Sequence, residues 1–479
     1  MLKYNIKSLT AFFLILVILY YPAYMYSQTG EIPITTSSEE ALSFFMEGRY
    51  KYENIQYATA AALFDEAILT DPGFAMAYLY RARCGGGFNI TQQNLDKACS
   101  LKDFISDGEK NLILFQKALA EGDHVLQKDH ILILLDSYPE DKRVHYNAGL
   151  YYDFIVDPPM ALMHYLRAIE IDNNYAAAYN KIGYDFIDLK FFKSAEEAFK
   201  KYINLIPNSP NPYDSYAELL LKLGKYQESI VQYQTAYQKD VLFTQALSGI
   251  GNNYIFIGEF EKARDYYHRQ HEKALRMNEK LDALMLIAIS YVHEGNIEEA
   301  VRTLELRRSF AENKKLIPDV IDSYNSIGFI LTEIGQVDKG KKYFDKAAKV
   351  VQESDLPENL NDAYLVENQM NTCYWLTKKN KLKEAENELK KCSDVVQKRE
   401  NMNETKRLNL IKGIYSLENN DSQAALDYFY SANTESPYTW YYMSKAYKKL
   451  GFIDHSGVYK DRIKFWNQNS LEYALVRNK

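Results

Sequence analysis

The feature that most constrains this chain is a repeat of 34 residues that keeps its register over four copies. One copy is marked by Tyr179, Gly183, Ala195, Phe199 and Pro207. The matching positions of the copies before and after are His145, Gly149, Ala161, Tyr165 and Asn173, and then Tyr213, Ala217, Ser229, Tyr233 and Val241; the fourth copy holds Leu247, Gly251, Ala263 and Tyr267. Small positions stay small and most large positions stay large. A period of this length indicates a stacked array of small units.

Within one copy, the small and large positions recur at the spacing of an α-helix. Ala195, Phe199 and Tyr202 share one helical face. Gly183 and Ala195 are small enough to let two helices approach closely, and Pro207 ends the second helix because it has no amide hydrogen. Glycines recur at the turn between the helices, where they allow a left-handed backbone; these are Gly224, Gly258, Gly295, Gly335 and Gly451. The pattern predicts an all-α protein built of helix hairpins.

The stretch 176–207 resembles the tetratricopeptide repeat (TPR), a helix-turn-helix unit of 34 residues. The family's defining positions are occupied by Tyr179, Ile182, Gly183, Phe186, Ala195, Phe199 and Pro207. Tyr202 departs from the family, which prefers alanine there. Weaker copies begin near Ala41 and near Lys406. The resemblance implies an α-solenoid of about twelve hairpins that forms a right-handed superhelix.

The spacing of the copies divides the chain into regions. We expect partly degenerate TPR-like units over 39–141, a regular array over 142–276, longer units over 277–436 and capping helices over 437–479. The extra residues of the longer units are predicted to lengthen the second helix of each hairpin. In the last region, Ser444, Ser456 and Lys460 stand at packing positions, as expected of a terminal unit whose outer face meets water.

The N-terminal segment has the pattern of an export signal. Lys3 and Lys7 precede an apolar run that begins at Leu9, and polar residues follow from Ser27. This pattern predicts a signal peptide over 1–27 and a linker over 28–38. The alternative is an uncleaved anchor over 9–26 in the inner membrane. Either way the body of the protein is expected outside the cytoplasm, in the periplasm or secreted.

Composition adds two constraints. The net charge is −7 and acidic and basic residues are interspersed, so the chain offers no basic tract for nucleic acid.

Four cysteines in an exported chain raise the question of disulfides. Cys373 and Cys392 fall on two helices that face the same hairpin interior, and Cys84 and Cys99 flank the Gly85–Gly87 break. Each pair is either bridged or a pair of small residues that fill small positions.

The chain carries no recognisable catalytic, cofactor or metal motif. Gly85–Gly87 is not followed by the lysine and hydroxyl residue of a phosphate loop. His268 and His271 share a helix face, but no third ligand accompanies them. We therefore expect a protein that is not an enzyme and that needs no cofactor.

The TPR resemblance implies that the first helices of successive units line a concave groove in which peptides lie. The residues at these inner positions are Arg143, Tyr146, Asn147, Asn180, Tyr184, Asp214, Glu218, Ser248, Asn252, Asp322, Asn325 and Phe329. Asparagine can satisfy donors and acceptors of a peptide backbone, and tyrosine adds contact area. The alternative is that these side chains are ordinary solvated helix positions. The Lys and Asn clamp with which chaperone-binding members hold a C-terminal carboxylate is absent.

These observations favour an exported scaffold that binds a protein or peptide in its groove. A second hypothesis is a membrane-anchored sensory or ligand-binding ectodomain that works through a partner. A third is an accessory subunit of an envelope enzyme or secretion complex. The repeats fill nearly all of the chain after residue 38, which leaves no room for a separate catalytic domain.

Overall fold

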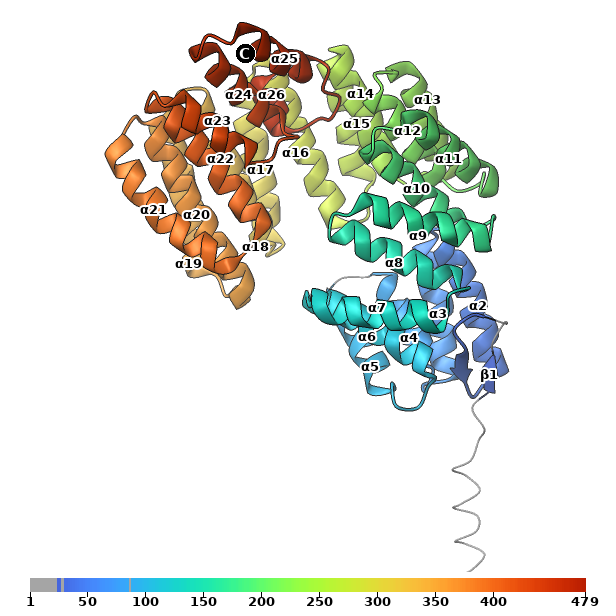
Figure 1. The fold of residues 1–479 in the computed structure, drawn as a ribbon. Coiled ribbons are helices and arrows are strands. Elements are labelled where there is room, and N and C mark those ends of the chain that lie inside the picture. The colour runs from blue at the N-terminus through green and yellow to red at the C-terminus, as the bar shows by residue number, and fades with distance from the viewer. Residues whose placement is uncertain (1–23, 27–29, 86–87) are drawn as a thin grey trace, which may run out of the picture. The chain divides into compact units, whose positions relative to one another are not determined.

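The protein is an all-α solenoid of helix hairpins (Figure 1). The computed structural model describes residues 24–26, 30–85 and 88–479, and these contain 25 helices and one two-stranded sheet. The helices α2 to α25 follow one another as twelve pairs, and the members of a pair such as α8 and α9 pack together. The chain divides into two compact units, 1–219 and 220–479, which are described separately. The handedness of the predicted superhelix stays a prediction.

The first unit begins with the sheet and contains five complete hairpins. Its elements are β1 (Tyr24–Tyr26), β2 (Ile34–Thr36), α2 (Glu39–Glu53), α3 (Tyr57–Thr70), α4 (Ala75–Arg83), α5 (Phe88–Ser100), α6 (Asp107–Glu121), α7 (His124–Ser137), α8 (Lys142–Phe154), α9 (Pro158–Ile171), α10 (Ala176–Asp188) and α11 (Phe192–Leu205). The region 73–141, where the repeat pattern is weak, thus contains the two hairpins α4–α5 and α6–α7.

Helix α12 (Asn211–Lys222) runs across the boundary, and the second unit holds the remaining helices. These are α13 (Tyr226–Lys239), α14 (Gln245–Ile257), α15 (Phe260–Lys273), α16 (Met277–Glu294), α17 (Ile297–Asn313), α18 (Ile317–Glu333), α19 (Val337–Glu353), α20 (Glu358–Lys378), α21 (Leu382–Arg399), α22 (Met402–Glu418), α23 (Ser422–Tyr430), α24 (Pro437–Lys449), α25 (Ile453–Lys464) and α26 (Leu471–Val476).

In six of the twelve hairpins, a glycine on the first helix packs against a ring on the second. A Cβ atom added to Gly183 would lie 2.4 Å from the ring of Phe199, and one added to Gly328 would lie 2.6 Å from the ring of Phe344. The same contact recurs in Gly48–Phe64, Gly149–Tyr165, Gly251–Tyr267 and Gly413–Phe429. The absence of a side chain therefore lets the ring pack directly on the helix backbone.

Helix length changes along the chain, although not quite as expected. Helices α8 to α15 have 12 to 14 residues, whereas α16 to α22 have 17 to 21 residues. The second helices α17, α19 and α21 lengthen to 17 or 18 residues, as expected, and the first helices α16, α18 and α20, for which no lengthening is predicted, lengthen as well. Two helices that pack side by side bury more apolar surface only when both are extended.

The segment predicted as a linker, 28–38, instead packs into the first unit over residues 32–36. Ile32 and Ile34 are buried, and the backbone of β2 pairs with that of β1. Glu109 accepts hydrogen bonds from the amide nitrogen of Thr35 at 2.8 Å and from its hydroxyl at 2.7 Å. Asp141 accepts one from the amide nitrogen of Ile32 at 2.9 Å. Carboxylates at the beginnings of α6 and α8 thus hold the segment, and no repeat pattern predicts this.

Most of the predicted signal peptide or anchor lies outside the described residues, as do Gly86 and Gly87. Across the described ranges, every helix is too short or too polar to be a candidate for a membrane span. All four cysteines are free thiols. Cys373 and Cys392 are both buried, and a hydrogen bond between their thiols raises the pKa of Cys373. The two thiols therefore share a hairpin interior, as the sequence predicts, without a bridge.

The C-terminal hairpin differs from the expected water-facing cap. Ser444 and Ser456 are buried, and their hydroxyl oxygens lie 2.9 Å apart across the α24–α25 hairpin, while Lys460 is exposed. The chain then turns back, and α26 packs against both α16 and α24 (Figure 1). The last residues of the chain therefore lie on helices formed far earlier in the sequence.

Candidate binding groove

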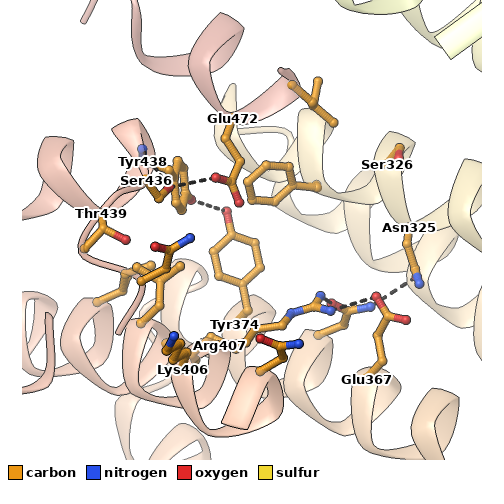
Figure 2. Close-up of a pocket in the computed structure, with 18 of the residues that line it drawn as sticks. Asn325, Ser326, Glu367, Tyr374, Lys406, Arg407, Ser436, Tyr438, Thr439 and Glu472 are labelled. Atoms are coloured by element: carbon orange, nitrogen blue, oxygen red, sulfur yellow. Dashed lines mark hydrogen bonds and ion pairs between the residues drawn. The ribbon is translucent and has the colours of Figure 1, made fainter. Parts of the chain in front are cut away.

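A cavity of about 500 Å³ lies in the second unit. It is lined by residues of α18, α20, α22 and α24, which are the first helices of four successive hairpins, and by Leu471 and Glu472 of α26. Figure 2 shows these side chains converging from separate helices. We call this site the groove cavity. The TPR resemblance likewise implies a binding groove that is lined by the first helices of successive units.

One wall of the groove cavity is a network of amide and charged side chains. The side-chain nitrogen Nδ2 of Asn371 donates to the side-chain oxygen Oδ1 of Asn325 at 3.1 Å. Arg407 donates to Oδ1 of Asn371 at 2.9 Å and to the carboxylate of Glu367 at 2.8 Å (Figure 2). Because each group holds the next, the wall presents fixed donors and acceptors from α18, α20 and α22.

A neighbouring part of the lining is aromatic. The ring of Phe329 lies 5.8 Å from that of Tyr374 and 5.3 Å from that of Tyr438. The hydroxyl of Tyr374 donates to Glu333 at 2.6 Å and lies 3.2 Å from that of Tyr438. Burial raises the pKa of both tyrosines, so their hydroxyls stay protonated. This wall offers apolar area with a few protonated hydroxyls.

Glu333, which accepts the hydrogen bond from Tyr374, is a buried and negatively charged carboxylate. It accepts hydrogen bonds from Lys378 and from Lys479, both at 2.8 Å. Burial disfavours the charge, but the two ammonium groups outweigh it and lower the pKa of Glu333 to about 2. The carboxylate is therefore ionised at neutral pH and joins the C-terminus to α18 and α20.

The remaining lining residues include polar groups that are available to a ligand. Asn403 and Lys406 are exposed near the beginning of α22. The hydroxyl of Thr439 is buried with no hydrogen-bond partner among the described residues. A buried hydroxyl without a partner costs free energy, which a bound donor or acceptor would recover.

Three of the predicted groove residues meet in this cavity: Asp322, Asn325 and Phe329. Asp322 also pairs with Arg307 at 3.0 Å. The other nine predicted residues lie elsewhere, so the structure does not bring the twelve together.

Arg143, Tyr146 and Asn147 of the first unit line a much smaller cavity, of about 50 Å³. Arg143 pairs with Glu53 at 2.5 Å and with Glu31 at 3.2 Å. Asn147 accepts a hydrogen bond from Arg83 at 3.2 Å. These side chains have partners within the protein.

Asn180, Tyr184, Asp214 and Glu218 form a second group in the first unit. Tyr184 donates to Glu218 at 2.6 Å, and Asn180 donates to Asn211 at 3.5 Å. Burial, with the charge of Glu218, raises the pKa of Asp214. The carboxyls of Asp214 and Glu218 therefore tend to hold a proton, and their negative charge would repel an anionic ligand.

Ser248 and Asn252 lie on α14, in the part of the second unit that the C-terminal segment covers. Ser248 donates to the Gln245 carbonyl oxygen at 2.7 Å. Asn252 accepts from Tyr267 at 2.8 Å and from Asn469 at 2.9 Å. The molecule's own chain therefore occupies the position at which the sequence predicts a ligand.

The sequence prediction missed several lining residues, and part of the signal was present. Arg143 and Asp322 stand second in their units, and the later units place Glu367, Arg407 and Tyr438 at that same position. All three line the groove cavity, so extending the rule would have found them. Nothing in the repeat pattern indicates Glu472, because it arrives from outside the array.

The fold and the site together define an α-solenoid in which the first helices of four hairpins line a cavity. The chain contains tetratricopeptide repeats: models of that repeat match residues 45–85 and 321–350. No curated protein matches the chain in sequence.

Among solved structures, the chain is similar to MamA (22% identity, 35% of this chain and 96% of MamA, TM-score 0.29). It is also similar to YrrB, described as a TPR protein with an unusual peptide-binding site (19% identity, 39% of this chain and 94% of YrrB, TM-score 0.29). A third similar structure is that of PilF of Pseudomonas aeruginosa (14% identity, 43% of this chain and 91% of PilF, TM-score 0.35).

Proposed function

We propose that this protein is an exported, non-enzymatic scaffold that binds a peptide segment of a partner protein in the groove cavity. The observation that carries the proposal is the lining itself: fixed amide and arginine side chains stand beside aromatic rings around a cavity of about 500 Å³. Amide side chains pair with the donors and acceptors of a peptide backbone. Aromatic rings contribute apolar contact at low entropic cost.

The charges of the cavity also suit a peptide. Arg407 and Lys406 bring positive charge from α22, whereas Asp322, Glu367 and Glu472 bring negative charge. A lining of mixed sign selects a ligand with separated charges and apolar side chains between them. The chemistry of an active site is not required for such recognition, and TPR arrays act as interaction surfaces.

The extracytoplasmic part of the proposal rests on the basic and apolar pattern of residues 1–27. The anchored alternative over 9–26 differs only in whether this segment is removed. Sequencing the N-terminus of the protein recovered from cells separates the two.

Site-specific photocrosslinking tests the groove. A photoreactive amino acid at Asn403, which is exposed in the cavity, is compared with one at Lys390, which is exposed on the second helix α21. We expect a crosslinked partner from position 403 alone. Adding Arg407→Ala should lower its yield about tenfold, the effect of roughly 1.4 kcal/mol.

Two results would contradict the proposal. One is an equal yield of the same partners from positions 403 and 390, which would indicate contact unrelated to the cavity. The other is an unchanged yield in the Arg407→Ala variant, provided that its circular dichroism melting curve matches that of the parent.

A further inference from the structure

A second cavity, of about 490 Å³, lies in the second unit and has a different chemistry. Six cationic side chains line it: Lys445, Lys448, Lys460, Lys464, Arg477 and Lys479. Neither aspartate nor glutamate is among its lining residues. We call it the basic cavity. It is separate from the groove cavity, and α26 contributes to both: Glu472 lines the groove cavity and Tyr473 lines the basic cavity.

This concentration of charge runs against the composition of the chain. The whole protein carries a net charge of −7, so acidic residues are available to neutralise a cationic site. Like charges around one cavity repel one another. Such an arrangement costs folding free energy, and an anionic ligand would recover it.

Two of the six cations have partners within the protein. Lys479 pairs with Glu333 at 2.8 Å, and Arg477 donates to the Ile255 carbonyl oxygen at 3.1 Å. Lys448, Lys460 and Lys464 are exposed, and no ion pair joins them to a described carboxylate.

Lys445 is the most enclosed of the remaining lysines. Its ammonium nitrogen lies 5.6 Å from the ring centre of Tyr441 and 5.5 Å from that of Tyr442. Burial lowers its pKa, and this effect outweighs the opposing charges of the Glu418 and Glu333 carboxylates. An added anion beside Lys445 would therefore stabilise its charged form further.

The rest of the wall is aromatic and held in place. The rings of Tyr226 and Phe256 stack at 5.9 Å with 7° between their planes, and Phe256 lies 5.9 Å from Tyr473. The hydroxyl of Tyr226 donates to Asn467 at 2.7 Å. The cavity therefore combines several cations with a preformed apolar surface.

We propose that the basic cavity is a second binding site, which takes a segment of peptide rich in aspartate and glutamate with an aromatic side chain among them. Five of the six cations are lysines, which are flexible point charges, and they come from α24, α25 and the C-terminal residues. Such a set suits several separate carboxylates, whereas arginine forks suit one phosphate. The proposal goes beyond the groove cavity and does not depend on its partner.

Fluorescence anisotropy with the full-length protein tests the site. The probe is a labelled glutamate-rich peptide that contains one tyrosine, and its control has every glutamate replaced with glutamine. We expect binding of the acidic probe alone, and weaker binding as salt rises. The triple variant Lys448→Gln, Lys460→Gln, Lys464→Gln should bind the probe at least about tenfold more weakly.

The matched control is the triple variant Lys383→Gln, Lys390→Gln, Lys391→Gln, which removes the same charge from exposed positions of α21. It should bind like the parent. An equal loss in both triple variants would reduce the effect to net charge and overturn the proposal. So would absence of binding, or binding of tripolyphosphate without the peptide. Crosslinking from Asn403 reports the groove cavity independently, so the two proposals fail separately.

Discussion

At the scale of the residue, one histidine pair shows how burial changes a side chain's chemistry. His145 stands at the repeat position that Tyr179 and Tyr213 occupy in the next copies. Its Nδ1 lies 3.1 Å from the Nδ1 of His164, and its Nε2 lies 3.0 Å from the Pro139 carbonyl oxygen. Burial, together with the neighbouring His145, lowers the pKa of His164 from 6.5 to about 4. Burial lowers the pKa of His145 as well. Both histidines are therefore neutral at neutral pH, and one ring must donate to the other.

This pair predicts a pH dependence of stability. Between pH 6.5 and about 4, the unfolded chain binds a proton at His164 that the folded protein does not. The free energy of unfolding should therefore be constant above pH 6.5 and fall as the pH drops toward 4. At about 1.4 kcal/mol per pKa unit, the loss approaches roughly 3 kcal/mol.

Urea denaturation at a series of pH values measures the effect. His164→Gln should reduce the slope across this window without removing it, because His293, whose pKa burial also lowers to about 4, remains. His268→Gln, at an exposed position, should keep the parent's slope. An unchanged slope in His164→Gln would show that other groups cause the acid sensitivity.

At the scale of the element, the hairpin is built by a glycine and a ring that are sixteen residues apart, as in Gly183–Phe199 and Gly413–Phe429. The repeat pattern predicts these contacts because both partners recur with the period. Helix length is less predictable. The extra residues of the later units are visible in the spacing, but the sequence does not say which helix receives them, because apolar residues continue the helical pattern on both sides of the turn.

Filling one of these glycine positions tests the packing. A Cβ at Gly183 would lie 2.4 Å from Phe199, so Gly183→Ala forces the ring or the helix to move. We expect a loss of about 1–3 kcal/mol in the free energy of unfolding. The control is Gly457→Ala on α25, where no atom lies within 4 Å and the better helix propensity of alanine should stabilise slightly. A smaller loss at 183 than at 457 would contradict this account.

At the scale of the whole molecule, the second unit departs from a simple array. In a solenoid, each unit contacts only its neighbours. Here Arg477 bonds to Ile255, Asn469 to Asn252 and Lys479 to Glu333. These contacts join residues between 146 and 222 positions apart, so the C-terminal segment couples α14, α16 and α18 to α24.

Removing residues 465–479 tests this coupling. Without the segment, Glu333 loses Lys479 and the ring of Phe256 loses Tyr473. We expect hydrogen exchange over α14 and α16 to become at least about tenfold faster, while α8 to α11 of the first unit keep their rates. Equal rates in both proteins over α14 and α16 would mean that the segment contributes no stability there.

The sequence by itself determined what repeats: the helix hairpin, its glycine and ring contacts and the number of hairpins. It also predicted three of the residues that line the groove cavity, Asp322, Asn325 and Phe329. These features are local, because each is set by residues within one period. The tertiary structure alone decided which positions remain open. Asn252 is covered by Asn469, whereas Asn325 lines a cavity, and both basic and groove cavities depend on α26. The physical reason is that contacts over such distances in the chain leave no periodic signal, so only the folded backbone brings them together.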